Sequence, residues 1–247
     1  PSIEETKARM SATIDIQKRA NIAKGPPDAR LRKDRLSRCI ELLLTHREEF
    51  VDAMNADFGA RSRDMSMLTD IVGAINPLKA ARAQLDGWMK PQSRKVTPAP
   101  LALFGARAEV RYQPKGVVGI ISPWNFPVQL SFDAISGAFA AGNRVMLKPS
   151  EFTPETSALM ARTLDLYFDE DEIAVFAGGA DVGAAFAGLP FDHLIFTGAT
   201  SVARHVMAAA AQNLTPVTLE LGGKSPVVIG RSADLEKTAA RVMNGKT

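Results

Sequence analysis

The front of the chain carries helical patterns of apolar and polar side chains. Across residues 29–54 the apolar positions recur three and four residues apart, which predicts one amphipathic helix with Cys39 on its apolar face. A second helical pattern covers residues 68–89 and stops where prolines begin. Residues 90–100 are therefore predicted to be a connector.

The pattern then changes to that of strands. Apolar and polar side chains alternate over residues 108–113, and Pro114-Lys115-Gly116 leads into the apolar run of residues 117–121. Two strands joined by so short a turn predict a β-hairpin.

The rest of the chain alternates strands with helices. Strands are predicted at residues 143–148, 173–177, 193–197, 217–221 and 227–229, and helices at residues 154–167, 202–212 and 234–246. Thr153 is predicted to be the N-cap of the helix that starts at Pro154.

This order of elements predicts an α/β fold, a doubly wound Rossmann-like parallel sheet with an N-terminal helical segment and a β-hairpin. The predicted units are a helical segment at residues 1–106, a hairpin arm at 107–121 and a Rossmann-like cofactor region at 122–247. Ligands of such sheets bind at the carboxyl ends of the strands. Candidate chemistry is therefore sought in the turns after Ile121, Lys148, Thr197 and Leu221.

Composition excludes several classes of protein. The 247 residues are 46% hydrophobic and 23% charged, which excludes a disordered or collagen-like chain. We expect neither a membrane span nor a secretory signal, because long apolar runs are missing and the first residues do not resemble a signal peptide. With the single cysteine this favours the cytoplasm. His46, His193 and His205 are scattered, so no metal site is predicted.

Charge is distributed unevenly. The net charge is +3, but residues 1–115 hold 21 basic and 14 acidic side chains. A basic front half raises the alternative of nucleic-acid binding. The basic residues alternate with acids and have few aromatic residues among them, so we do not expect nucleic acid as a partner.

Two of the turns carry candidate catalytic groups. Asn125 lies in Ser122-Pro123-Trp124-Asn125-Phe126-Pro127, directly after an apolar strand, where its amide could donate to a developing oxyanion. The alternative is a structural turn with both aromatic rings in the core. Glu220 ends a strand beside two glycines, where partial burial would make it a working base. A tight turn with a solvated acid is equally compatible with the residues.

The other two turns carry candidate nucleotide-binding groups. Lys148 and Glu151 lie on one short loop that could reach the hydroxyls of a ribose, and an acid there disfavours a 2′-phosphate. The alternative is a solvated loop at a helix entry. Residues 196–203 pass from a strand into a helix through small side chains, which suits a pyrophosphate. Their pattern is neither a Walker A loop nor a Gly-x-Gly-x-x-Gly fingerprint.

Taken together, these motifs resemble those of the NAD(P)-dependent aldehyde dehydrogenase superfamily. They read Pro-Trp-Asn-Phe-Pro (123–127), Lys-Pro-Ser-Glu (148–151), Phe-Thr-Gly (196–198) and Glu-Leu-Gly-Gly-Lys (220–224), in this order. Residues 57–62, 68–71 and 109–114 are similar to the coniferyl aldehyde dehydrogenase-like branch. The resemblance covers nearly the whole chain.

The resemblance implies roles for individual residues. Asn125 would be the oxyanion donor and Glu220 the base that activates water for hydrolysis of an acyl-enzyme. Lys148 and Glu151 would hold the adenosine ribose. The implied cofactor is NAD, with NADP left open, and its site residues would be Ile121, Pro123, Trp124, Lys148, Ser150, Glu151, Phe196, Gly198, Val202 and Leu221. The substrate would be an aldehyde, coniferyl-type or another aromatic or aliphatic one, and the hairpin implies a homodimer or homotetramer.

The sequence departs from the family pattern in two places. The phosphate turn usually reads Gly-Ser-Thr-x-x-Gly, whereas Ala199 and Ala203 stand here. In the family the nucleophilic cysteine follows the glutamate, on a second domain. We therefore expect this chain to be a cofactor-binding half, truncated before its nucleophile and inactive alone. A non-catalytic nucleotide-binding or assembly module is the alternative.

Overall fold

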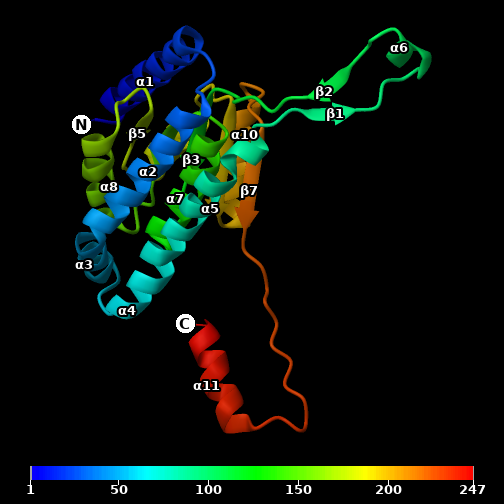
Figure 1. Cartoon of the computed structure of the whole chain (residues 1–247). Coiled ribbons are helices and arrows are strands. Elements are labelled where there is room, and N and C mark those ends of the chain that lie inside the picture. The colour runs from blue at the N-terminus through cyan, green and yellow to red at the C-terminus, as the bar shows by residue number, and fades with distance from the viewer. Residues whose placement is uncertain (1, 247) are drawn as a thin grey trace.

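Five parallel strands form the central sheet of the computed structural model, which describes residues 2–246 (Figure 1). The strands lie in the order β5 (Ile173–Val175), β4 (Arg144–Lys148), β3 (Val117–Ile121), β6 (His193–Gly198) and β7 (Val217–Leu221). Residues 1 and 247, which bound two of the predicted units, lie outside the described residues. The five strands of this sheet are all parallel, and the predicted α/β fold is confirmed.

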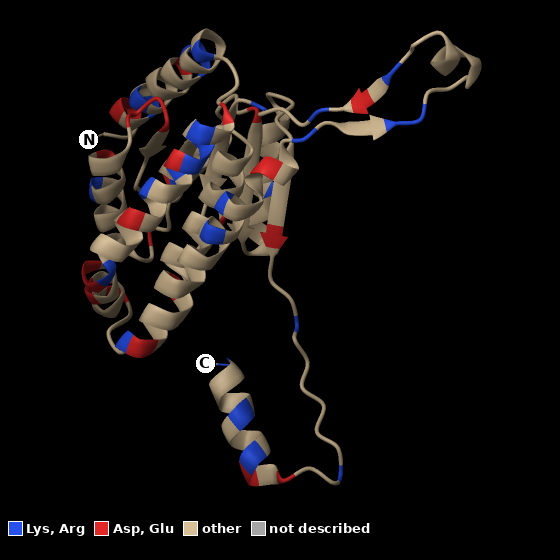
Figure 2. Cartoon of the chain, viewed as in Figure 1, with Lys and Arg blue, Asp and Glu red and all other residues tan. Residues whose placement is uncertain are grey.

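Helices cover both faces of the sheet, which makes it doubly wound. On one face α7 (Pro127–Ala140) and α8 (Pro154–Tyr167) pack on the strands, and α2 (Ala29–Thr45), α3 (Arg47–Phe58) and α5 (Gly73–Trp88) pack on these two helices. The other packs against α1 (Ile3–Lys24), α9 (Ala180–Ala187) and α10 (Thr200–Ala211). Blue and red segments alternate along α2, so its charge is of mixed sign (Figure 2).

The predicted single helix over residues 29–54 is wrong, because the chain breaks at His46. The backbone of His46 has φ −100° and ψ 14°, outside the helical region, and α3 starts at the next residue. Phe50 and Met54 are nevertheless buried like Leu42 and Leu43 before the break. The apolar spacing continues across the bend, so periodicity alone does not reveal it.

Helix α1 was not predicted, since its side chains are polar around most of the helix. Its local signal is a capping box, in which the Ser2 hydroxyl accepts from the Glu5 N–H and the Glu5 carboxylate accepts from the Ser2 N–H. Its buried residues Met10 and Ile14 pack on the sheet, and Gln17 Nε2 donates to the carbonyls of Val145 and Glu170, each at 2.9 Å. Helix α1 thus covers the β4 side of the sheet.

A β-hairpin is present, but the predicted pairing of its strands is wrong. Strand β2 (Ala108–Val110) pairs with β1 (Gln92–Arg94), which lies in the predicted connector. The predicted partner is β3, whose five residues are all buried in the sheet. An apolar run buried on both faces is typical of a central parallel strand. The hairpin projects from the body and carries α6 (Pro100–Leu103) between its strands (Figure 1).

The predicted strand at residues 227–229 is not formed. Residues 222–230 take no regular structure, and Val228 is 91% exposed. A strand needs a neighbour for its backbone hydrogen bonds, and none of residues 2–246 pairs with this segment. Helix α11 (Leu235–Lys246) follows and buries none of its side chains. Across residues 2–246 every helix is too short or too polar to cross a lipid bilayer.

Candidate functional site

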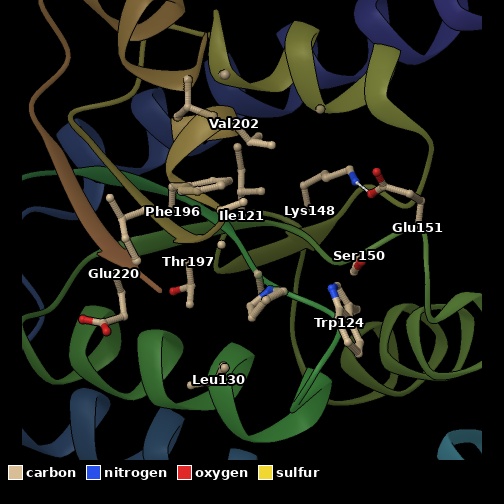
Figure 3. A pocket seen from close by; sticks show the side chains of 18 of the residues that line it. Ile121, Trp124, Leu130, Lys148, Ser150, Glu151, Phe196, Thr197, Val202 and Glu220 are labelled. Atoms are coloured by element: carbon tan, nitrogen blue, oxygen red, sulfur yellow. Dashed lines mark hydrogen bonds and ion pairs between the residues drawn. The ribbon is translucent and has the colours of Figure 1, made fainter. Parts of the chain in front are cut away.

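The carboxyl ends of the neighbouring strands β4, β3, β6 and β7 lie side by side at the same end of the sheet. In the register of the sheet, Ile121 lies beside Lys148 on one side and Phe196 on the other, and Thr197 lies beside Glu220. The four turns singled out in the sequence therefore surround the same space. This space is a cavity of about 1100 Å³ (Figure 3).

All twelve predicted site residues line this cavity. They are Ile121, Pro123, Trp124, Asn125, Lys148, Ser150, Glu151, Phe196, Gly198, Val202, Glu220 and Leu221. Their proximity follows from the parallel register.

Sequence reasoning missed one wall of the cavity. Ala180, Gly183 and Ala184 of α9 line it, together with His205 and Ala209 of α10. The available signal was the run of glycine and alanine from residue 177 to 188, which leaves a smooth apolar surface.

Lys148 and Glu151 form an ion pair inside the cavity (Figure 3). Lys148 Nζ lies 2.6 Å from Glu151 Oε2, and the lysine side chain is 3% exposed while that of the glutamate is 34% exposed. Burial raises the pKa of Glu151, but the hydrogen bond and charge of Lys148 outweigh it and hold the pKa below its usual value. The cavity thus presents a carboxylate at this position, which accepts from hydroxyls and repels a phosphate placed directly beside it.

The entry to α10 is built from small residues. Gly198 ends β6, and a Cβ atom there would lie 2.7 Å from Cζ of the Phe196 ring, so the ring packs directly over the glycine. Ala199 is the N-cap residue and its side chain supplies no capping bond. The first N–H groups of a helix have no partner within it. The positive end of α10 is thus available to an anion at the cavity wall.

Asn125 lies on the exposed rim of the cavity, between β3 and α7. The start of its loop is fixed, because the Ser122 N–H donates to the Lys148 carbonyl and a hydrogen bond of 2.7 Å joins the hydroxyls of Ser122 and Ser131. Trp124 is half exposed and lines the cavity, so it does not plug the core as the structural alternative required.

Glu220 and Cys39 differ sharply in exposure. Of the two alternatives left open by the sequence, the structure shows the solvated acid: Glu220 is exposed, because β7 is the edge strand and residues 222–230 after it are all exposed. Cys39 is fully buried in the core between helices and strands. Burial raises the pKa of the Cys39 thiol, so the thiol stays protonated. Burial also keeps the thiol inaccessible to a substrate. Cys39 is therefore a core residue.

Comparison with known sequences gives one consistent family. The sequence profile of the aldehyde dehydrogenase family matches residues 4–247. A probable coniferyl aldehyde dehydrogenase of Caulobacter vibrioides is 59% identical over all of this chain and 51% of its own length. The coniferyl aldehyde dehydrogenase of a Pseudomonas species is 53% identical over 97% of this chain and 49% of its own length. The chain spans about half the length of these relatives.

Comparison with solved structures gives the same fold. AldH of Staphylococcus aureus, in a substrate-bound state, superposes with a TM-score of 0.88 and 33% identity over 95% of this chain and 50% of its own. Two further matches were solved with, or named for, nicotinamide cofactors. An aldehyde dehydrogenase from Bacillus cereus in complex with NAD⁺ has TM-score 0.81, 27% identity and coverages of 95% and 47%. An NADP-dependent enzyme of Escherichia coli has TM-score 0.83, 27% identity and coverages of 97% and 49%.

Proposed function

Because the chain belongs to the aldehyde dehydrogenase family, in its coniferyl aldehyde dehydrogenase branch, we propose that the enzyme containing it oxidises an aldehyde to the carboxylic acid with NAD. A coniferyl-type aldehyde is the first substrate to test, since the relatives named above carry that name. The convergence of twelve predicted site residues on one cavity carries the proposal. This chain supplies the cofactor site and two catalytic side chains.

The residues that line the cavity fit a dinucleotide. The cavity volume of about 1100 Å³ is just above the usual range of about 300–1,000 Å³ for small-molecule sites, as a large ligand requires. We assign the ribose to Lys148 and Glu151, and the pyrophosphate to the start of α10 at residues 199–202. The bound cofactor supplies a hydride acceptor for the oxidation.

Asn125 and Glu220 act on the acyl group in this proposal. The side-chain amide of Asn125 donates a hydrogen bond to the oxyanion that forms when a thiolate attacks the aldehyde carbonyl. In the hydrolytic step Glu220 takes a proton from water as the water oxygen attacks the thioester carbonyl, and the thiolate leaves. The exposure of Glu220 gives water direct access to its carboxylate.

The thiolate must come from outside these 247 residues, because Cys39 is the chain's single cysteine and is fully buried. We therefore expect the chain alone to form no NADH from coniferyl aldehyde, whereas the complete enzyme does. Robust aldehyde-dependent NADH formation by the chain alone would refute the assignment of Cys39 to the core.

Binding of NAD to this chain tests the cofactor site directly. Trp124 lines the cavity and Trp88 lies outside it, so a Trp88→Phe variant leaves Trp124 as the reporter. We expect saturable quenching of Trp124 fluorescence by NAD. The Trp124→Phe variant, which keeps Trp88, is the control and should show no saturable quenching. Failure of NAD to bind in calorimetry with folded protein would count against the site.

Binding without turnover would favour the second candidate function. The proposed nucleotide site lies within this chain, whereas its one cysteine is buried. A nucleotide-binding module needs the site and does not need an accessible thiol. A complete polypeptide that binds NAD but oxidises no aldehyde, coniferyl aldehyde included, would support that module.

The charge of Glu151 should set the cofactor preference. We expect Glu151→Gln to tighten NADP binding by about tenfold and to weaken NAD binding, because the repulsion of a 2′-phosphate is removed. Isothermal titration with both cofactors measures the ratio. Glu155→Gln is a matched control, since Glu155 is an exposed acid nearby that does not line the cavity. Equal shifts in both variants would contradict a specific role for Glu151.

We further propose that the β1–β2 hairpin joins subunits into a dimer or tetramer. Near its α6 turn Leu103 and Phe104 are 87% and 88% exposed, an apolar pair that a monomer would leave in water. Leu103→Glu combined with Phe104→Glu should shift the complete enzyme toward monomers in sedimentation velocity. An unchanged assembly would remove the tip of the hairpin from the interface.

A further inference from the structure

One arginine from the N-terminal helical segment holds the backbone of the Asn125 loop. Arg61 lies between α3 and α4 (Arg63–Ser66), and its Nη1 donates to the carbonyl oxygen of Asn125 at 2.7 Å. Its Nη2 donates to Oδ2 of Asp70, also at 2.7 Å. The guanidinium carbon is 4.8 Å from the centroid of the Phe58 ring and 5.1 Å from that of Phe126. Two hydrogen bonds and the faces of two aromatic rings therefore fix the position of the Arg61 side chain.

Asp70 connects the same arginine to the start of α7. Its carboxylate is fully buried, and Oδ1 accepts from the N–H groups of Val128 at 3.1 Å and Gln129 at 3.2 Å. These are first-turn N–H groups that the helix itself cannot satisfy. Asp70 lies in a π-helical turn (Met67–Val72), a rare geometry that is frequent at functional sites. The carbonyl of Asn125 and the first turn of α7 are thus held by one ion pair.

A second carboxylate of the same segment caps α8. Asp57 accepts from the N–H groups of Glu155 and Thr156, each at 2.9 Å, and from the Thr156 hydroxyl at 2.6 Å. The predicted cap, Thr153, stands at the N-cap position but makes no side-chain capping bond. Residues 57–70 therefore fasten the helices that follow both the Asn125 loop and the Lys148–Glu151 loop.

A buried ion pair is weak support for stability, because apolar residues of similar volume often do as well. This pair has a further effect, since it fixes one peptide unit beside the cavity. The Asn125 side chain is exposed on the rim, so its direction depends on where its backbone is held. A fixed donor stabilises an oxyanion without reorganisation during the reaction.

We propose that Arg61 and Asp70 are positioning residues that aim the Asn125 amide at the reacting carbonyl. The proposal rests on the proposed function, because it assigns Asn125 to the oxyanion. Arg61 does not line the cavity and acts through the Asn125 peptide. A purely structural role would instead change stability and leave the turnover of folded enzyme intact.

The first test is a double-mutant cycle in the complete enzyme. Arg61→Ala should lower kcat by about tenfold, part of the 10²–10³ that loss of an oxyanion donor costs, with KM for NAD within about twofold. Because Arg61 acts through Asn125, adding Arg61→Ala to Asn125→Ala should cost little more than Asn125→Ala alone. Losses in kcat that multiply would overturn the proposal, as would an Arg61→Ala enzyme with unchanged kcat.

Two further variants separate positioning from folding. Arg61→Lys keeps the charge but cannot bridge two acceptors with a planar fork, so kcat should remain low although the protein folds. Arg63→Ala is the matched control, since Arg63 is a half-exposed neighbour paired with Glu48 and Asp52. Full activity of Arg61→Lys would reduce Arg61 to a structural charge.

A readout without catalysis distinguishes failure of this proposal from failure of the proposed function. In the 247-residue chain, Arg61→Lys and Asp70→Asn should speed hydrogen exchange at the Val128 and Gln129 amides and broaden the side-chain NH₂ signals of Asn125 in NMR spectra. These changes are expected even if the complete enzyme oxidises no aldehyde. Unchanged exchange and unchanged Asn125 signals in a folded variant would refute the positioning role directly.

Discussion

Replacing Glu172 by alanine is expected to lower the free energy of unfolding by about 3–5 kcal/mol, because the buried Arg35 loses its carboxylate partner and Arg38 loses one of two. Glu172 Oε1 lies 2.8 Å from Nε of Arg35, and Oε2 lies 2.8 Å from Nη1 of Arg38. The arginines come from α2 and the glutamate directly precedes β5, so the cluster joins the N-terminal helices to the sheet. Urea unfolding followed by circular dichroism measures the loss.

Asp34→Ala is a matched control for this prediction. Asp34 pairs with the same Arg38, at 2.8 Å, but its side chain is 53% exposed. Exposed pairs contribute about 0–1 kcal/mol, so this variant should unfold almost like the parent chain. Equal losses in the two variants would show that burial of the Glu172 cluster does not matter.

The same cluster predicts a loss of stability in acid. Burial raises the pKa of Glu172, but hydrogen bonds from Arg38 and Arg35 outweigh it and hold the pKa below its ordinary value of 4.5. A carboxyl whose pKa is lowered by folding stabilises the fold above its unfolded pKa, and this contribution is lost as the pH falls through the folded pKa. Stability of the parent chain should therefore fall more steeply below pH 4.5 than that of Glu172→Gln.

Asn125→Ala is expected to reduce kcat of the complete enzyme by about 10²–10³-fold, because the oxyanion loses a fixed donor. The loss should affect acylation and thioester hydrolysis alike, since both steps form an oxyanion at the same carbonyl. Rapid-mixing measurement of the NADH burst separates the two steps. Glu220→Gln provides the contrast, because it should slow hydrolysis and leave the burst rate unchanged.

Asn55→Ala makes the same chemical change at an exposed position on α3, outside the cavity, and should leave kcat unchanged. If Asn125→Ala behaves like Asn55→Ala, Asn125 is not the oxyanion donor.

Local patterns predicted the sheet and the cavity because strands, turns and helix starts are encoded within a few residues. The motif at residues 148–151 needed only a strand before it and a helix after it, and the parallel register brought it beside Trp124 and Asn125. The predicted pairing of the hairpin strands was wrong because the choice of a partner strand is not encoded locally. Residues 108–113 carry a strand pattern that does not specify a partner, and β1 lies in a proline-flanked stretch with no alternation.

Long-range polar contacts could not be predicted from the sequence for a similar reason. Arg61 and Asn125 are 64 positions apart, and neither residue carries a local signal of the other. Asp57, which lies 98 positions before Glu155, accepts the hydrogen bonds expected for the Thr153 cap, although Thr153 has the better local position. Such contacts depend on how the N-terminal helices dock on the sheet, which periodicity does not specify.

Helix α1 has a consequence for the order in which the chain is made. Its docking site includes the carbonyl of Glu170, which lies 153 positions after Gln17. At about 5–20 residues per second, a ribosome needs about 8–30 s to synthesise the intervening chain. For that time Met10 and Ile14 lack part of the apolar surface on which they pack. Helix α1 is thus synthesised well before its docking site is complete, and a chaperone that binds short apolar segments has several seconds in which to bind it.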